Sequence, residues 1–398
     1  MRVCRLTWNF PTGRELTHGL GPTFYHISRE QAALGLDVHV IMLRKSSRPS
    51  YKEVEGVKVH FVNSPYNVNV VRKIAELNRK IGLDVIHAHS TCGLLYSVFR
   101  KGIGVPLVVH VHGTTLGMEN FEFDLPSSFS FKYSLKSKFR RKISALRQLF
   151  FWRKADLLIA VSQAQKEELK TLYGVNDGKI RVVYLGVDPN IFRRYGDVSF
   201  LRDRHKLGNK RIILFVGHFG LRKGIPFLIR AMPKILKENP DTVLLCVGGT
   251  PKWLGTRLYW DYLKNMIREL SLSNSVRLVG EIPHHELPYY YSMADVFAFP
   301  SLYEAFGKVV VEAMACETPV VASKVGGIPE IIHHGYNGLL VEATNVDQLA
   351  EAISALLFSK DFARRLGKKA RQTVLEKFTW RYTAESLNKV YLEVTENI

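Results

Sequence analysis

The residues best suited to chemistry form one block in the C-terminal half of the chain, which reads PSLYEAFGKVVVE. Two carboxylates, Glu304 and Glu312, stand on either side of an aromatic–glycine pair, Phe306-Gly307. A carboxylate accepts short, charge-assisted hydrogen bonds from sugar hydroxyls. If a helix begins beside the glycine, its free amide groups can also face a sugar or a phosphate. The block therefore predicts a site for a hydroxyl-rich or phosphorylated ligand.

The local propensities of this block also allow a different structure. Three consecutive valines are β-branched, and residues of this kind favour a strand. A buried strand from Lys308 to Val311 would leave the two glutamates on the surface without a joint role. The spacing of two glutamates does not by itself choose between this strand and a helix that begins at the glycine.

Length and composition describe a globular protein of more than one domain. The chain has 398 residues, 46% of them hydrophobic and 23% charged, which is long for one ordinary domain. No apolar run reaches the roughly 18 residues of a membrane span, and the first residues are strand-like rather than those of a signal peptide. The four cysteines are scattered without a Cys-x-x-Cys pair, which indicates neither a zinc site nor a disulfide framework. We therefore expect a cytoplasmic protein.

The charge balance indicates a partner that carries phosphate. With 56 lysines and arginines against 36 acidic residues, the formal net charge is +20. A basic surface attracts nucleotides, anionic lipids and nucleic acids alike. The excess is spread along the chain, and no zinc-finger, RRM-like or KH-like pattern is present. We therefore expect no nucleic-acid partner.

Apolar, strand-like runs alternate with helical stretches along the chain. Such runs, flanked by helices, predict parallel strands buried on both faces. They form two series, separated by a charged stretch from Gly186 to Arg211 that reads as a linker. The predicted strands are Val3–Trp8, Val38–Leu43, Val57–Val62, Val85–Ala88, Leu107–Val111, Leu157–Val161 and Val182–Tyr184, and then Ile212–Val216, Val243–Val247, Val276–Val279, Val296–Phe299, Pro319–Ala322 and Leu339–Val341. The pattern predicts two Rossmann-like, doubly wound α/β domains.

Ligands in such sheets bind beyond the carboxyl ends of the strands, so we searched those positions. After the first strand, Gly19 and Gly21 would let backbone amides approach a phosphate, although a simple tight turn has the same residues. The strand Ile212–Val216 is followed by His218 and then by adjacent Arg222 and Lys223. These cations would either neutralise a phosphate group or form a solvated basic loop.

Histidines gather at the ends of two other predicted strands. His112 follows Leu107–Val111 directly, where it would either contact a ligand or be packed. His87, His89 and His110 look structural. Together with His112 they also form a candidate metal set, but no carboxylate or cysteine stands near them in the sequence. We therefore expect no metal.

The 300–330 block, the Lys223-Gly224 pair after a Val-Gly turn and the closing Phe378-Thr379-Trp380 motif resemble glycosyltransferase family 4, the retaining nucleotide-sugar glycosyltransferases. The resemblance covers essentially the whole chain. It implies the GT-B fold, in which two Rossmann-like domains face each other across a cleft. The implied activity is transfer of a hexosyl group from a nucleoside diphosphate sugar to the hydroxyl of a sugar or lipid-linked acceptor. The resemblance implies no cofactor and no metal.

The resemblance also implies boundaries and residue roles. It implies an acceptor-side domain over 1–190, a nucleotide-sugar domain over 191–378 and a helix over 379–398 that crosses back to the first domain. The implied catalytic residues are His112, Glu304 and Lys223. The implied donor-binding residues are Gly19, Gly21, His218, Arg222, Ile282, Phe306, Gly307, Lys308 and Glu312. Glu312 would accept from the ribose hydroxyls, and Glu304 would lie near the anomeric centre of the donor sugar.

Three positions depart from the family pattern. His218 stands where an arginine is usual, so either Arg222 or a protonated His218 would supply that charge. Tyr184-Leu185 replaces Pro-Asn, and Lys308 replaces an apolar residue. Two other functions remain open: a GT-B-fold nucleotide-sugar epimerase, and a non-catalytic scaffold that binds a nucleotide sugar or a membrane.

The stretch 131–154 is the individual part of this chain. It contains nine lysines and arginines and no acidic residue, and apolar residues recur at spacings of three or four. As a helix it would carry an apolar stripe and a basic face. Such a helix lies well on an anionic membrane surface, here the inner face of the cell membrane. The alternative is that the stripe packs onto the first domain and the basic face is only solvated.

Overall fold

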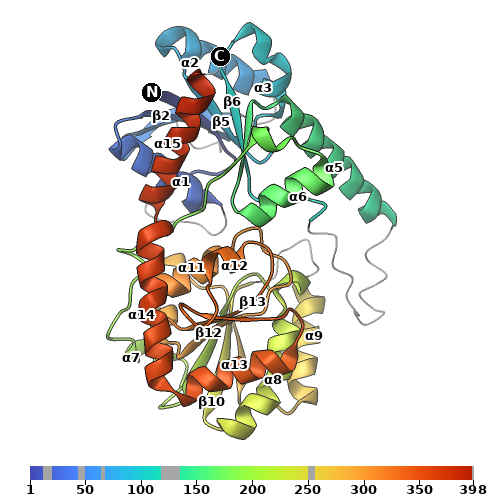
Figure 1. The fold of residues 1–398 in the computed structure, drawn as a ribbon, viewed down its shortest axis with the longest axis vertical. Coiled ribbons are helices and arrows are strands. Elements are labelled where there is room, and N and C mark those ends of the chain that lie inside the picture. The colour runs from blue at the N-terminus through green and yellow to red at the C-terminus, as the bar shows by residue number, and fades with distance from the viewer. Residues whose placement is uncertain (12–19, 44–49, 64–67, 118–134, 250–255, 397–398) are drawn as a thin grey trace. The chain divides into compact units, whose positions relative to one another are not determined.

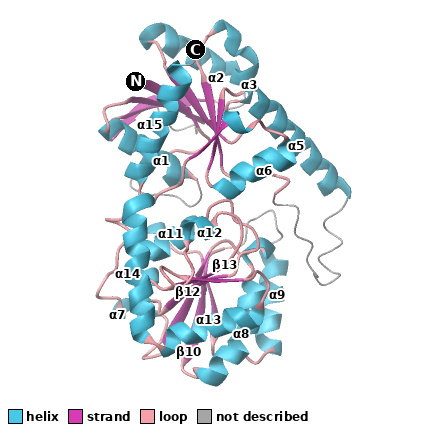
Figure 2. Ribbon diagram, in the orientation of Figure 1, coloured by secondary structure: helices cyan, strands magenta, loops and turns pink. Residues whose placement is uncertain are grey.

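The computed structural model describes the chain apart from residues 12–19, 44–49, 64–67, 118–134, 250–255 and 397–398. The chain divides into two compact units (Figure 1). Unit 1 comprises Met1–Leu185 with Trp380–Ile398, and unit 2 comprises Gly186–Thr379. Each unit is a sheet of mostly parallel strands covered by helices (Figure 2). The prediction of two doubly wound α/β domains is confirmed.

Unit 1 contains an eight-stranded sheet in the order β3-β4-β2-β1-β5-β6-β7-β8. Its strands are β1 (Arg2–Leu6), β2 (Asp37–Leu43), β3 (Tyr51–Val54), β4 (Val57–Val62), β5 (Val85–His89), β6 (Leu107–Val111), β7 (Leu157–Ala160) and β8 (Ile180–Val182). Its described α-helices are α1 (Gly21–Ala33), α2 (Val68–Ile81), α3 (Leu94–Phe99), α5 (Leu135–Lys154), α6 (Gln163–Tyr173) and α15 (Trp380–Glu396). The strand order reverses between β1 and β5, which is the topological switch point of this sheet.

Unit 2 contains a six-stranded parallel sheet in the order β11-β10-β9-β12-β13-β14. Its strands are β9 (Arg211–Val216), β10 (Thr242–Val247), β11 (Val276–Gly280), β12 (Val296–Phe299), β13 (Val320–Ser323) and β14 (Leu339–Val341). Its described α-helices are α7 (Ser199–Arg204), α8 (Ile225–Glu238), α9 (Thr256–Glu269), α10 (Leu287–Met293), α11 (Lys308–Ala315), α12 (Ile328–Ile331), α13 (Val346–Phe358) and α14 (Lys360–Lys377). The strand order reverses between β9 and β12.

Most strands are rich in apolar residues, as expected where helices cover both faces of a sheet. In unit 2, Ile213 and Leu214 of β9 stand in register with Val296 and Phe297 of β12, and all four side chains are fully buried. Buried side chains in register on neighbouring strands form the core of each unit. The same register fixes the positions of the strand ends within each sheet, and the candidate residues follow those ends.

Two parts of the fold differ from the sequence-based expectation. Strand β3, an antiparallel neighbour of β4, was not predicted, because it is a largely exposed edge strand without an apolar run. The stretch predicted as a linker contains helix α7, and it is attached to unit 2. There the Tyr195 amide donates to Ser292 Oγ at 3.0 Å.

The C-terminal helix α15 completes unit 1 by packing beside α1 (Figure 1). The Trp380 ring stacks on His26 with 5.6 Å between centroids, and Gln31 donates to Asn388 Oδ1 at 2.8 Å. The buried Tyr391 hydroxyl lies 2.5 Å from His87 Nδ1 and accepts from Arg5 Nη2 at 3.4 Å. No helix in the described ranges has the length and apolar content that a membrane crossing requires.

We predict that Tyr391→Phe lowers the free energy of unfolding by about 1–3 kcal/mol, because the buried groups of Arg5 and His87 lose a partner. Leu392→Ala on the same helix is the matched control, since Leu392 is half exposed. Urea unfolding of both variants would check this. An equal loss in both variants would contradict a specific role of the hydroxyl.

Candidate active site

The residues predicted for unit 2 gather where the strand order of its sheet reverses. Strands β9 and β12 are neighbours, but the chain leaves β9 toward β10 and leaves β12 toward β13, on opposite sides. The loops that follow the two strands therefore diverge and leave room for a ligand. Lys223 lies in the loop after β9, and Glu304 lies in the loop after β12.

Glu304 is the centre of a buried polar cluster. Its Oε1 accepts hydrogen bonds from Lys223 Nζ and, at 3.0 Å, from Ser301 Oγ. Arg222 Nη1 lies 3.5 Å from the same oxygen and donates to the Tyr303 carbonyl at 3.0 Å. Burial by itself raises the pKa of Glu304, but the charges of Lys223 and Arg222 outweigh it, so the pKa of this carboxyl is below its ordinary value.

Lys223 is as strongly enclosed as its partner. Burial lowers the pKa of Lys223 and Arg222 lowers it further, while Glu304 opposes both. Its ammonium also lies 4.9 Å from the centre of the Phe299 ring. An ionised carboxylate, that of Glu304, and two cationic side chains, those of Lys223 and Arg222, therefore lie together at the ends of β9 and β12.

Two glycines allow the loops to approach this cluster closely. Gly224 has φ +68°, and a Cβ there would stand 1.8 Å from the Pro300 carbonyl oxygen. Gly326 has φ +49°, and a Cβ there would stand 1.8 Å from the carbonyl oxygen of Glu304. The next amide, that of Gly327, donates to this carbonyl at 3.0 Å. Only glycine fits at both contacts.

The block after Glu304 forms a helix, so the alternative of a strand from Lys308 to Val311 is wrong. Helix α11 begins at Lys308, directly after Gly307, whose φ is +111°. The helix forms despite the β propensity of the valines because it buries Val310 and Val311 against α10, α14 and the sheet. The amides of its first turn have no side-chain cap in the described structure.

Glu312 points inward from α11 and is almost fully buried. Its Oε2 accepts from the Tyr291 hydroxyl at 3.1 Å, and Lys308 Nζ lies 3.5 Å from its Oε1. Neither Tyr291 nor Ser301 is among the residues that the sequence predicted for the site. No pattern in the sequence points to either residue, because each is recognised only by the carboxylate that it contacts.

The other predicted residues of unit 2 lie in neighbouring loops. His218 is exposed between β9 and Lys223, so Arg222 is the side chain that accompanies Lys223 at Glu304. Phe306 is buried and meets the Phe378 ring edge to face, with 5.9 Å between centroids. Ile282 is buried just after β11.

The predicted histidines of unit 1 lie on and directly after the neighbouring strands β5 and β6. His87 and His89 on β5 face His110 and His112 on and after β6, and His89 stands in register with His110. Helix α1 covers them: the Phe24 ring lies 4.3 Å from His89 and 5.7 Å from His112.

Among the described residues, most ring nitrogens of these four histidines have no hydrogen-bond partner, although His89 Nδ1 and His112 Nε2 lie 2.9 Å apart. Burial lowers the pKa of His112 to about 3 and lowers those of His87, His89 and His110 well below the ordinary value. The imidazoles are therefore neutral at physiological pH.

Three of the four histidines in the candidate metal set lie close together. Ligand nitrogens of His87, His89 and His110 lie within 4.8 Å of one another. However, the set contains no carboxylate, and the Arg5 guanidinium lies 3.4 Å from His87 Nδ1. A divalent ion would be buried next to a fixed positive charge without a counter-ion, which is unfavourable. We therefore assign no metal to this cluster.

The two predicted glycines of the first loop can be placed only in part. Gly21 is the first residue of α1 and is buried. Gly19 lies outside the described residues.

Comparisons with known proteins identify the family. Residues 17–191 match the model for Glycosyltransferase Family 4, and residues 197–373 match the model for Glycosyl transferases group 1. An uncharacterized glycosyltransferase of Methanocaldococcus jannaschii is 30% identical over 98% of this chain and 98% of its own length. The chain belongs to the group 1, family 4 glycosyltransferases.

Solved structures agree with this assignment at the level of the fold. Sucrose-phosphate synthase from Thermosynechococcus elongatus has a TM-score of 0.80 at 23% identity and covers 100% of both chains. The Anabaena protein HepE, solved in complex with UDP and glucose, has a TM-score of 0.74 at 21% identity and covers 99% of this chain and 100% of its own. The GT-B fold expected from the resemblance is confirmed, and this protein is a glycosyltransferase.

We predict that Gly326→Ala lowers the free energy of unfolding by about 2–4 kcal/mol and reduces turnover, because the new methyl group displaces Glu304. Gly335→Ala is the matched control: its φ is +77°, but nothing lies within 4 Å of the added Cβ. In Gly335→Ala, backbone strain alone should lower the free energy of unfolding by about 1–2 kcal/mol. Denaturation and activity assays of both variants would check this, and equal losses would rule out the contact with Glu304 as the cause.

We further predict that unit 1 loses stability as the pH falls below about 6.5, the ordinary pKa of histidine. Between that pH and the lowered pKa of about 3 for His112, the imidazoles are protonated in the unfolded chain but remain neutral in the folded protein. Lowering the pH therefore favours the unfolded state. Each such imidazole lowers the free energy of unfolding by up to about 1.4 kcal/mol for each pH unit below 6.5.

Urea unfolding at a series of pH values would measure this slope. His110→Met should reduce the slope by about 1.4 kcal/mol per pH unit, which corresponds to one proton. Methionine is a suitable replacement because both ring nitrogens of His110 lack hydrogen-bond partners in the described structure. His285→Met, at an exposed position in unit 2, controls for the loss of an imidazole. An unchanged slope in His110→Met would contradict the prediction.

Proposed function

We propose that this glycosyltransferase is a retaining hexosyltransferase that moves a sugar from a nucleoside diphosphate sugar to an acceptor hydroxyl. The observation that carries the proposal is the buried Lys223–Glu304 pair, with Arg222 beside it, at the switch point of the unit 2 sheet. Two cations beside a carboxylate suit a diphosphate leaving group attached to a hydroxyl-rich sugar. The UDP and glucose bound to HepE, which shares the fold, support a nucleotide-sugar donor.

In the proposed reaction, the bond between the anomeric carbon and the diphosphate oxygen breaks. A bond from the anomeric carbon to the acceptor oxygen forms on the same face of the sugar. The acceptor hydroxyl gives its proton to the leaving diphosphate, so the products are the glycoside and the nucleoside diphosphate. Lys223 and Arg222 stabilise the charge that develops on the diphosphate. No protein nucleophile is needed, unlike in a retaining glycosidase with two carboxylates.

The two glutamates have different tasks in this proposal. Glu304 remains ionised because its pKa is lowered, so it positions the donor sugar and stabilises positive charge at the anomeric centre. Glu312, oriented by Tyr291, accepts from the ribose hydroxyls. Neutral His112 contacts the donor sugar as a hydrogen-bonding group. No metal enters the proposal, because basic side chains and the start of α11 serve the diphosphate and the sugar.

The proposed acceptor is a sugar or a lipid-linked molecule, and the proposed role is in the synthesis of a glycolipid, a lipid-linked oligosaccharide or a cell-surface glycan. The proposed place of action is the cytoplasm, at the inner face of the cell membrane.

The proposal is tested by thermal unfolding with UDP, GDP or ADP in the presence of a chelator, followed by product analysis. A ligand at 100 times its Kd adds about 2.7 kcal/mol, so the donor base should be evident. Turnover of the matching nucleotide sugar to a glycoside of retained configuration would support the proposal. A changed sugar nucleotide formed without acceptor would indicate an epimerase, and no response to any base would indicate a scaffold.

We predict that Glu304→Gln reduces kcat at least about 100-fold and changes donor Kd less than about fivefold, because its charge acts mainly in the transition state. Steady-state kinetics and donor titration would measure both. Lys223→Met should instead abolish most of the stabilisation by the nucleoside diphosphate.

Lys234→Met is the matched control for the loss of an ion-paired lysine in unit 2. Lys234 pairs with Asp347 and Glu351 away from the strand ends, so its replacement should leave kinetics unchanged. Unchanged turnover in Glu304→Gln, with normal folding, would refute the role of this carboxylate.

A further inference from the structure

Helix α5 presents an apolar stripe to solvent. Ile143, Leu146 and Phe150 stand at helical spacings of three and four, and Leu146 and Phe150 are 65% and 49% exposed. The opposite face, with Phe151 and Trp152, is buried in unit 1. The alternative that this stripe packs onto the domain is therefore wrong for the described residues of α5.

The exposed stripe is lined by basic residues. Arg147 and Lys154 share the helix face of Phe150, because they lie three residues before it and four residues after it. Both are exposed, as are Lys142 and Arg153, and the Lys154 ammonium lies 5.1 Å from the centre of the Phe150 ring. No acidic residue occurs between 131 and 154 to neutralise them locally.

A cationic pocket of about 530 Å³ adjoins the C-terminal end of α5. It lies at the N-terminal end of β7, which is the opposite end of the strands from the candidate site. Its charged lining consists of Arg100, Lys101, Arg153, Lys154, Lys179, Asp156 and Glu393. Five cations therefore face two carboxylates.

Both carboxylates already have partners. Arg100 Nη2 donates to Asp156 Oδ1 at 2.8 Å, and Arg181 Nε donates to Glu393 Oε2 at 2.8 Å. Lys179 donates to the backbone carbonyl of Arg153, so its charge has no carboxylate in direct contact among the described residues. The pocket thus keeps a surplus of positive charge that an anion would neutralise.

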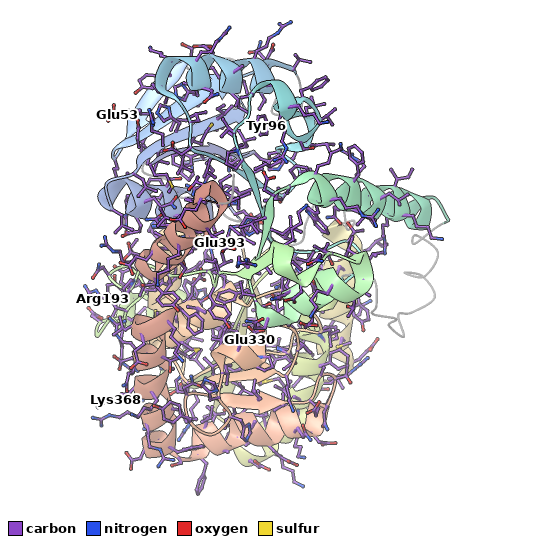
Figure 3. The ribbon with its side chains drawn as sticks, turned by 45° about the horizontal axis from the view of Figure 1, so that its top comes forward. Glu53, Tyr96, Arg193, Glu330, Lys368 and Glu393 are labelled. Atoms are coloured by element: carbon purple, nitrogen blue, oxygen red, sulfur yellow. The ribbon has the colours of Figure 1, made fainter. Side chains whose placement is uncertain are left out.

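Apolar side chains also border the pocket. Val98 of α3 forms part of its wall, and Val98 and the neighbouring Phe99 are largely exposed. Lys154 connects the pocket to Phe150 of the α5 stripe. In Figures 1 and 3, α5 extends outward from the body of unit 1, and Figure 3 shows Glu393 on the nearby α15. The surface therefore combines exposed apolar groups with unneutralised cations.

We propose that α5 and this pocket form a docking surface for an anionic phospholipid bilayer. Ile143, Leu146 and Phe150 enter the boundary between headgroups and acyl chains, and the basic residues meet the lipid phosphates. One phosphate occupies the pocket, whose lining includes Lys101 and Arg153. That this docking would bring the enzyme to a lipid-linked acceptor rests on the proposed function. The docking itself requires no sugar substrate.

The experiment is co-sedimentation of the full chain with vesicles of phosphatidylglycerol and phosphatidylcholine, compared with pure phosphatidylcholine. Binding is expected only to the anionic vesicles and should weaken as salt rises. Leu146→Ser/Phe150→Ser should reduce the partition coefficient at least about tenfold. Arg153→Glu/Lys154→Glu should reduce it by about fivefold or more for each charge removed.

Matched controls lie in unit 2. Phe358→Ser removes a side chain that is 87% exposed, and Arg364→Glu/Lys368→Glu reverses two exposed charges on α14. Both should sediment like the unaltered protein. Circular dichroism and thermal unfolding of every variant would show that the fold is kept.

The proposal would be overturned by no binding to anionic vesicles, by equal binding to neutral vesicles, or by equal binding of the α5 variants and the controls. Stabilisation by inorganic phosphate, lost in Arg153→Glu/Lys154→Glu but without vesicle binding, would assign the pocket to a soluble phosphate ligand instead. Capture of RNA in place of vesicles would likewise overturn it. None of these outcomes affects the donor-binding test, so failure of docking and failure of the transferase proposal are distinguishable.

Discussion

The buried ion pair between Lys223 and Glu304 is the interaction on which the candidate site of unit 2 depends. Burying two charges is unfavourable unless each has good partners. Here Ser301 and Arg222 supply them, and the Arg222 carbonyl in turn accepts from Ser301 Oγ and the Leu302 amide. The loops after β9 and β12 are therefore tied to each other by side chain and backbone at once. In the proposed reaction, a diphosphate entering this cluster would meet a Lys223 ammonium that is already desolvated and oriented.

In unit 1, the buried candidate side chains on and after β5 and β6 are neutral instead of charged. Its four histidines are kept neutral by burial, with Arg5 and Tyr391 closing one end of the cluster. Neutral imidazoles can donate and accept hydrogen bonds without adding charge. In the proposed reaction, the cations of unit 2 would serve the diphosphate, its ionised Glu304 would serve the donor sugar, and the neutral His112 of unit 1 would add an uncharged hydrogen-bonding group.

Helix α5 shows how one amphipathic segment can have two apolar faces. Phe151 and Trp152 hold the helix on unit 1, while Leu146 and Phe150 remain outside. A contiguous exposed apolar stripe is more indicative of an interaction surface than scattered exposed apolar residues are. The unneutralised cations around the stripe are the reason to expect an anionic surface rather than an apolar protein partner.

The sequence by itself determined the two parallel sheets, most strand positions and the loops that carry the candidate residues, because buried parallel strands must be apolar throughout and ligand loops must follow their ends. It also placed Glu304 and Lys223 in those loops. Only the tertiary structure decided that Arg222 accompanies Lys223 at Glu304, that Tyr291 orients Glu312, and that the stripe of α5 faces outward. These outcomes depend on contacts between segments far apart in the chain, and periodicity or motif spacing holds no information about such contacts. The edge strand β3 was missed for a related reason, since its pairing with β4 leaves no apolar signature.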